Sequence, residues 1–181
     1  MKKGYNMLVL KALEFFINNP YKEIHLREFS RIMKISLNSA QRFLNLFLEE
    51  GFVKEERKAN LRYFKANMGD IVFKHIKIIW NLKLIRDSGL IDSLKNICSS
   101  LVLFGSVARG LDDFKSDLDL VCISKEKNIN TERFEGKLGR QINLHIFSFS
   151  QWKLQKSQNK PFYQDVIVEG INLIGEIPII D

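Results

Sequence analysis

Cysteine is scarce in this sequence of 181 residues, and its two cysteines fit none of the usual metal-binding patterns. Cys98 and Cys122 lie among apolar or small residues, without a C-x-x-C spacing and without a histidine-rich tract. This pattern excludes a zinc ribbon and a disulfide-rich scaffold. We therefore expect two buried free thiols in a reducing compartment.

Long apolar runs, internal repeats and low-complexity tracts are absent as well. The sequence contains neither a stretch able to span a membrane as a helix nor a signal-like N-terminus. These absences predict a cytoplasmic protein with no membrane partner. The length accommodates one domain or two small ones, and a hydrophobic content of 45% is sufficient for packed cores.

Basic residues outnumber acidic ones, which gives a formal net charge of +7 and an isoelectric point of about 9.4. Residues 1–70 contain 13 Lys and Arg against 8 Asp and Glu, whereas the rest contains 15 against 13. This excess favours an anionic partner such as a nucleic acid or a nucleotide. A solvated surface gives the same bias, so charge supports nucleic-acid binding without establishing it.

The most informative stretch is LVLFGSVARGLDDFKSDLDLVCIS, residues 101–124. Its first four residues predict a buried strand, which Gly105-Ser106 interrupts before a short helix. A strand that enters a helix through Gly-Ser presents backbone N–H groups that can bind phosphate. Asp117 and Asp119 then share one face of a second strand, about 6.6 Å apart along the chain. Two carboxylates beside a phosphate cradle predict Mg²⁺ held against a nucleoside triphosphate.

These residues resemble the GSxARG…SDxDL motif of the minimal nucleotidyltransferases in the DNA polymerase beta-like superfamily. The resemblance implies a mixed β-sheet flanked by helices and Mg²⁺-dependent transfer of a nucleotidyl group from an NTP to a hydroxyl. The residues that it assigns to the nucleotide are Gly105, Ser106, Arg109 and Ser116, and those that it assigns to catalysis and to the metal are Asp117 and Asp119. The alternative is an ordinary strand–turn–strand unit with surface acids.

The sequence departs from the family pattern on the next strand, where active members carry a third carboxylate. Here residues 139–143 read Gly-Arg-Gln-Ile-Asn, so the matching position is Asn143. An amide binds a metal weakly and cannot accept a proton near neutral pH. His145 lies two residues on, where it either substitutes as base or ligand or is only a strand residue. The nucleotide-binding half of the motif is complete, and the catalytic half is not.

The first 70 residues carry a different pattern. Apolar residues at helical spacing predict three helices, with a short extended piece at residues 24–26 before the second. The expected helices are Tyr5 to Ile17, Leu26 to Met33 and Leu37 to Glu50. Phe52–Glu55 and Arg62–Lys65 then predict paired strands joined by residues 57–60. This order resembles a winged helix-turn-helix domain.

That resemblance implies duplex DNA as a partner. The third helix carries exposed side chains of types that read base edges in the major groove. They are Asn38, Ser39, Gln41, Arg42 and Asn45. The wing adds cations that would face phosphates or the minor groove, namely Arg57, Lys58 and Arg62. The alternative is a packing or dimerisation module with an ordinary polar face, since winged helices also contact proteins.

A helix is predicted from about Met68 to Leu84, without a flexible Gly/Ser linker. Its expected inner face is formed by Ile71, Val72, His75, Ile76, Ile79 and Leu82. Apolar residues 78–80 extend beyond this face, so we expect residues 71–84 to pack against both domains or against a second copy in a homodimer. His75 on this helix is expected to be an ordinary core or surface histidine.

The sequence thus predicts an α+β chain with a winged helix-turn-helix at residues 1–68, connecting helices at 69–97 and a minimal nucleotidyltransferase domain at 98–181. One hypothesis is a nucleotidyltransferase fused to a DNA-binding domain, which the intact motif favours. A second is a DNA-binding regulator whose nucleotidyltransferase domain is weak or silent, which the missing third acid favours. A third is a toxin–antitoxin component with a small helical partner protein.

Overall fold

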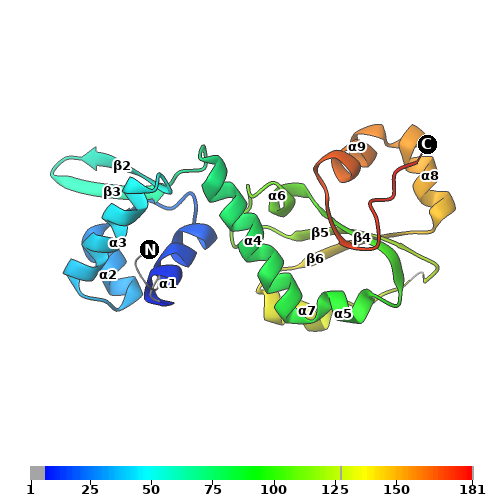
Figure 1. Cartoon of the computed structure of the whole chain (residues 1–181), viewed down its shortest axis with the longest axis horizontal. Coiled ribbons are helices and arrows are strands. Elements are labelled where there is room, and N and C mark those ends of the chain that lie inside the picture. Colours follow the sequence, from blue (N-terminus) through cyan, green and yellow to red (C-terminus); the bar gives the residue numbers. More distant parts are fainter. Residues whose placement is uncertain (1–6, 127, 181) are drawn as a thin grey trace, which may run out of the picture. The chain divides into compact units, whose positions relative to one another are not determined.

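The structure is a computed structural model that describes residues 7–126 and 128–180, so Tyr5, where the first helix was expected to begin, lies outside the described residues. The chain divides into two compact units, Met1–His75 and Ile76–Asp181, and contains both helices and sheets (Figure 1). The elements of the first unit are α1 (Met7–Asn18), β1 (Ile24–His25), α2 (Leu26–Met33), α3 (Leu37–Glu49), β2 (Val53–Lys58) and β3 (Leu61–Ala66). Helix α4 (Ile71–Ser88) runs from the first unit into the second.

The first unit is built on a phenylalanine core. The Phe16 ring lies 5.5 Å from that of Phe29 and 6.0 Å from that of Phe47, centroid to centroid, so α1 packs on both α2 and α3. Helix α3 begins where the Ser36 hydroxyl accepts a hydrogen bond from the backbone N–H of Ser39 at 3.2 Å, a standard N-terminal cap. Lys34 ends α2 in the left-handed conformation, which permits the short connection to α3.

A three-stranded antiparallel sheet in the order β1-β3-β2 completes this unit. The paired strands run further than the sequence predicts, because Lys58 still pairs with Leu61. Only Ala59 and Asn60 are left as the turn, and Ala59 has a positive φ of 52°. Arg57 therefore lies on a strand and not in the connecting loop.

The second unit centres on a four-stranded sheet in the order β6-β5-β4-β7. Strands β5 and β6 are parallel, and the other pairs are antiparallel. Its elements after α4 are α5 (Leu90–Leu94), β4 (Cys98–Phe104), α6 (Gly105–Ala108), β5 (Leu118–Ser124), α7 (Glu132–Leu138), β6 (Ile142–Phe147), α8 (Phe149–Gln158), α9 (Lys160–Glu169) and β7 (Ile171–Ile174). This mixed α+β architecture is consistent with a nucleotidyltransferase fold.

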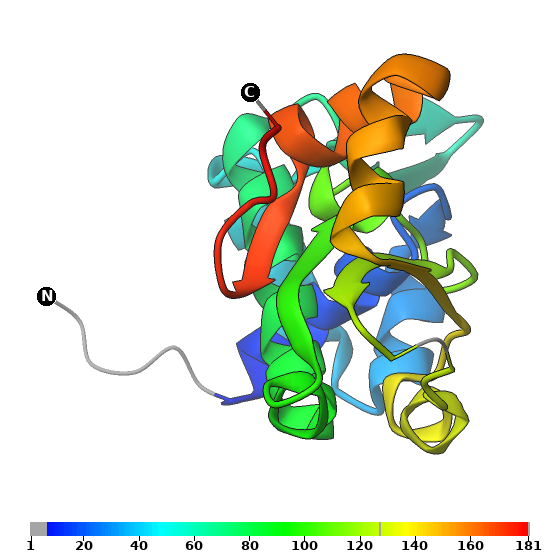
Figure 2. The same cartoon turned by 90° about the vertical axis from the view of Figure 1, so that its right-hand side faces the viewer.

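Helices cover both faces of this sheet, α8 and α9 on one and α5 and α7 on the other (Figures 1 and 2). Two apolar clusters follow from the strand alternation. Val102 and Val121 pack with Trp152 of α8, whereas Leu103 and Leu120 pack on the opposite face. The central strands β4 and β5 are buried on both sides for this reason.

Helix α4 buries a different face from the one that its apolar pattern predicts. Three residues expected to point inward, Ile71, Val72 and Ile79, are 65%, 54% and 65% exposed. Four buried positions, each four residues after the previous one, are Phe73, Lys77, Asn81 and Ile85, and Ser88 at the end of the helix is buried as well. The prediction of the inner face was wrong for these three residues, whereas Leu82 does pack against the core of the second unit. Polar side chains with buried partners occupy much of the buried face instead. The expected homodimer through residues 71–84 stays a prediction.

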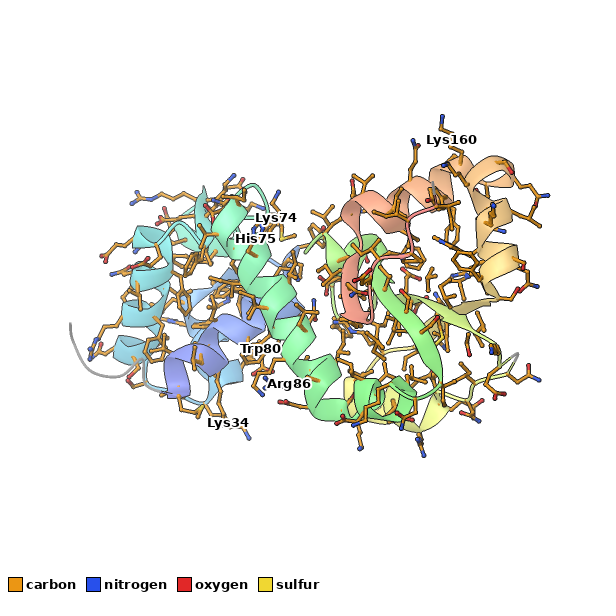
Figure 3. All side chains as sticks on the ribbon, turned by 45° about the vertical axis from the view of Figure 1, so that its right-hand side comes forward. Lys34, Lys74, His75, Trp80, Arg86 and Lys160 are labelled. Atoms are coloured by element: carbon orange, nitrogen blue, oxygen red, sulfur yellow. A yellow bond between two sulfur atoms is a disulfide. The ribbon has the colours of Figure 1, made fainter. Side chains whose placement is uncertain are left out.

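His75 on α4 is a surface residue (Figure 3). Its Nδ1 atom lies 2.7 Å from the carbonyl oxygen of Ile71, one turn earlier. The histidine therefore contacts its own helix, in agreement with an ordinary surface role. Among the described residues, no helix combines the length and the apolar character that a bilayer crossing requires.

The two cysteines are not free thiols. Cys98 on β4 and Cys122 on β5 form a disulfide with a Cα–Cα distance of 5.8 Å. The sequence analysis missed this bond because the cysteines are 24 residues apart and become neighbours only when β4 and β5 pair across an irregularity in their register. The argument for a reducing compartment from free cysteines therefore no longer holds.

Candidate functional site

Three adjacent strands bring the motif residues into one row. Phe104, the last residue of β4, pairs with Asp119 on β5, and Asp119 pairs with Asn143 on β6. Alternation along β5 and β6 places Asp119 and Asn143 on the sheet face that α8 and α9 cover. The two halves of the motif therefore meet at one end of the sheet, beside the position where the third carboxylate was expected.

Gly105 gives the strand-to-helix turn its close approach to Asp119. Its φ is +72°, and a Cβ atom at this position would lie 2.6 Å from Asp119 Oδ2. Any other residue would meet both a backbone penalty and a collision with the carboxylate. The absence of a side chain at 105 thus lets the carboxylate lie directly against the turn.

Asn143 bonds to both aspartates. Its amide nitrogen donates hydrogen bonds to Asp117 Oδ2 at 3.2 Å and to Asp119 Oδ1 at 3.1 Å. The two acids are half-buried and Asn143 is exposed, so the group borders solvent. One amide donor thus holds the two carboxylates together, where a third acid would repel them.

The short helix α6 begins at Gly105, immediately beside this pair of acids. The first N–H groups of any helix have no partner within the helix. Ser106 is half-buried at this turn, and its carbonyl oxygen accepts a hydrogen bond from Leu111 N at 2.9 Å. A role of this turn in binding phosphate stays a prediction.

Two residues assigned to the nucleotide have protein partners in the structure. The Arg109 guanidinium donates to Asp165 at 2.8 Å and to Glu169 at 3.0 Å, both on α9, and these acids raise the pKa of Arg109. The Ser116 hydroxyl accepts a hydrogen bond from Asp113 N at 3.0 Å and so closes a turn. Their roles toward a nucleotide stay predictions.

His145 lies on the same face as Asn143 and is exposed. Its ring centroid is 5.7 Å from that of Phe104 and 5.6 Å from that of Phe162 on α9. The imidazole thus belongs to an aromatic cluster at the border of the site. These contacts give it a packing role, and a role as base remains a separate hypothesis.

The donor set suits one Mg²⁺ ion together with a nucleotide. In the part of the chain that the structure describes, no group of three or more His, Cys, Asp and Glu side chains is placed to hold a metal. Mg²⁺ binds through one or two carboxylates when phosphate oxygens and waters supply its other ligands. Asp117 and Asp119 meet this requirement.

In the first unit, helix α3 presents the side chains expected to contact DNA. Asn38, Arg42 and Asn45 are exposed, whereas Ser39 and Gln41 are half-buried. Gln41 donates a hydrogen bond to Asn45 at 2.8 Å. A groove of about 420 Å³ runs between this helix and the hairpin, and its lining residues are His25, Leu26, Arg27, Gln41, Asn60, Leu61, Arg62 and Phe64.

The cations of the hairpin have acidic partners. Lys58 bonds to Glu23, which raises the pKa of Lys58, and Arg62 donates to Glu55, with one bond of 2.7 Å. Arg57 lies 3.7 Å from Glu55 and its side chain is 80% exposed, so it is the most accessible of the three. The sequence analysis counted the cations of the wing without the acids on the paired strands.

A buried polar group around Asp112, five residues before Asp117, was not predicted from the sequence. Asp112, in the loop between α6 and β5, bonds to side chains from α4 and from the bend between α7 and β6. We name this group the Asp112 cluster, and its members are Lys77, Asn81, Asp112 and Arg140. The spacing of four between Lys77 and Asn81 was a weak signal, because α4 carries other polar residues, such as Lys74 and Lys83, that are not part of the group.

The close approach at Gly105 is tested by Gly105→Ala, with Gly89→Ala as a matched control. Both glycines have positive φ, but a Cβ at Gly89 has no atom within 4 Å. We expect the control to lower the free energy of unfolding by about 1–2 kcal/mol from backbone strain alone. Gly105→Ala should lower it by more than the control does, because the Asp119 carboxylate must also move to make room for the Cβ atom. Urea denaturation followed by circular dichroism measures both, and equal losses would contradict the proximity of Asp119.

Comparison with known proteins bears on the second unit. Searches of curated proteins and of solved structures find no match. Residues 89–162 match the family model described as nucleotidyltransferase domain. This segment contains the Gly105-Ser106 turn, both aspartates and Asn143. The match supports the assignment of residues 89–162 to the nucleotidyltransferase superfamily.

Proposed function

We propose that the second unit binds a nucleoside triphosphate with Mg²⁺ and transfers its nucleotidyl group to an acceptor hydroxyl. The observation that carries this proposal is the Asp119 carboxylate lying between the Gly105 turn and Asn143, with Asp117 beside it. A phosphate cradle and a pair of carboxylates thus share one end of the sheet, within the segment that matches the family model.

Each group has a defined task in this proposal. The N–H groups at the Gly105-Ser106 turn hold the phosphates, and Asp117 and Asp119 hold the metal. When bound, Mg²⁺ would neutralise phosphate charge and stabilise the charge that develops on the leaving group. Transfer forms a bond between the acceptor oxygen and the α-phosphorus and breaks the bond to pyrophosphate, which leaves. The acceptor proton must pass to a base, and Asn143 cannot serve as one.

A second candidate function follows from Asn143. Its amide donates to both carboxylates, so the site holds its acids together without a third carboxylate. Loss of a general base commonly lowers a rate by about 10²–10⁴-fold and leaves ligand binding intact. The second candidate is therefore a regulator in which this domain binds Mg²⁺ and NTP with little or no turnover.

We propose further that the first unit is a winged helix-turn-helix that binds duplex DNA. The element order, with α3 beside a hairpin in a sheet of order β1-β3-β2, supports this proposal. The exposed amides of Asn38 and Asn45 and the guanidinium of Arg42 are side chains that read base edges. Since Lys58 and Arg62 bond to acids, Arg57 is the wing residue best suited to a phosphate.

Nucleotide binding should require a divalent metal, because Asp117 and Asp119 otherwise repel the phosphates. Titration calorimetry of the full chain with each of the four ribonucleoside triphosphates, with and without Mg²⁺, measures this dependence. In the double variant Asp117→Asn and Asp119→Asn, nucleotide binding should no longer depend on Mg²⁺. The double variant Asp87→Asn and Asp92→Asn makes the same change in charge at exposed positions and should bind as the wild type does. Equal binding with and without Mg²⁺ would refute the site.

Turnover of the wild type should be slow or absent, and the cause should lie at Asn143. Asn143→Asp is nearly isosteric and supplies an acid on the same strand face, so we expect about a 10²–10⁴-fold faster transfer with affinity for the nucleotide within a few-fold. Labelled NTP incubated with Mg²⁺ and cell lysate reports the transfer. If His145→Ala instead abolishes a robust wild-type activity, histidine is the base. If no variant transfers label, the regulator is favoured.

DNA binding should weaken steeply as the salt concentration rises. Arg42→Ala should relax sequence preference, whereas Arg57→Ala should weaken binding to all sequences alike. Lys58→Ala removes an ion-paired cation and serves as the matched control with the smaller effect. Gel shifts on genomic fragments over a range of salt concentrations measure all three. Binding that is absent or insensitive to salt would favour a protein-contact role.

A further inference from the structure

The Asp112 cluster places ionised groups in the interior of the second unit. Lys77 is 0% exposed, Asp112 is 2% exposed and the Arg140 side chain is 8% exposed. Asp112 accepts hydrogen bonds from Asn81 Nδ2 at 3.2 Å and 3.1 Å, one to each oxygen, and from Arg140 Nη1 at 3.2 Å. Lys77 Nζ completes the cluster at 3.4 Å from Asp112 Oδ1. The carboxylate therefore has donors from two separate parts of the chain.

The two residues at positions 140 and 141 hold both ends of one loop. The Arg140 side chain binds Asp112, and the Gln141 carbonyl oxygen accepts a hydrogen bond from Leu118 N at 2.9 Å. Between these two points the chain forms a turn, in which Asp113 and Ser116 bond to each other at 3.0 Å and 3.2 Å. The segment 112–118 is thus a closed turn with two anchors on the same short stretch.

The anchored turn leads directly to Asp117, a residue of the proposed site. Asp117 comes directly before Leu118, and Asn143 comes two residues after Gln141. The anchors therefore set the relative positions of the Asp117 carboxylate and the Asn143 amide, which are 3.2 Å apart. A shift of the turn away from β6 would separate them.

The buried charges of the Asp112 cluster are not explained by a contribution to stability alone. Burial of charged groups is unfavourable, and a buried ion pair seldom stabilises a protein more than apolar residues of the same size. Burial lowers the pKa of Lys77, which shows that desolvation outweighs its attraction to Asp112. Two cations in the cluster thus share one acid, and the polar side chains of Lys77 and Asn81 on α4 lie in the interior instead of in solvent.

We propose that Asp112 is a positioning residue of the nucleotide site. Its bond to Arg140 anchors the turn that places Asp117 in the site. Asn81 and Lys77 of α4 are its remaining polar partners, and neither of them connects Asp112 to the segment that precedes β6. The proposal rests on the proposed nucleotide site for its functional consequence. Its structural consequence, the anchoring of residues 112–118, is independent of any ligand.

A matched pair of variants separates anchoring from stability. Arg140→Met and Lys77→Met each remove one buried cation and leave Asp112 with the other cation and with Asn81. Only Arg140→Met removes the bond between Asp112 and the segment that leads into β6. In the metal-free full chain, we expect Arg140→Met to raise amide hydrogen exchange of residues 113–118 by about tenfold or more, and Lys77→Met to leave it near the wild-type rate. Arg133→Met makes the same substitution on α7, where the guanidinium bonds Ser93 instead, and should have no effect on this segment.

Binding of ATP with Mn²⁺, followed by paramagnetic resonance of the metal, gives the functional readout. Its affinity should fall by about tenfold or more in Arg140→Met and stay within a few-fold in Lys77→Met, because a displaced carboxylate no longer meets the metal. Asp112→Asn, which keeps the shape but not the charge, should behave as Arg140→Met does. If Asp112→Asn fails to fold, Arg140→Met decides, since it leaves one buried cation, Lys77, paired with one buried acid, Asp112.

Two outcomes would overturn the inference. One is unchanged exchange of residues 113–118 in a folded Arg140→Met variant, and the other is equal changes in Arg140→Met and Lys77→Met. If the wild type binds no ATP with Mn²⁺, the proposed function fails, yet the exchange measurement still decides whether Asp112 anchors the turn. The two proposals are therefore tested separately.

Discussion

The pairing register of β5 with its two neighbours is the constraint on which the arrangement of Asp117, Asp119 and Asn143 depends. The strand is antiparallel to β4 and parallel to β6, and one row of this register contains Phe104, Asp119 and Asn143. Buried apolar residues on both faces fix that register, because a shift by one residue would turn every side chain to the opposite face. The disulfide between Cys98 and Cys122 joins the same two strands, β4 and β5. The position of the carboxylates is thus a consequence of core packing.

Asn143 gives this site its particular chemistry. Its amide is a hydrogen-bond donor to Asp117 and Asp119, whereas a third carboxylate would add negative charge and accept a proton. Under the proposed function, the two aspartates would hold one metal ion, and Asn143 would leave the site without an evident base. The same geometry is therefore compatible with both proposals, a slow transferase and a nucleotide-responsive regulator.

How far the sequence determines the structure depends on the kind of interaction. The motif residues were identified from the chain because strand alternation and a Gly-Ser turn are local rules. Local rules also gave the helices and the hairpin of the first unit, with boundaries that moved by a few residues. The buried face of α4 was wrongly predicted, because its hydrophobic pattern pointed to Ile71 and Ile79 and gave no sign that Lys77 and Asn81 have a buried acid as partner.

The sequence by itself determined which residues are available: the Gly105-Ser106 turn, two aspartates in alternation, and Asn143 in place of an acid. Only the tertiary structure decided which of them meet. It paired the two cysteines, turned Arg109 toward acids on α9 and joined Asp112 to Arg140. Each of these contacts joins residues at least 24 positions apart. Their partners are set by strand order and helix packing, which no local periodicity in the chain encodes.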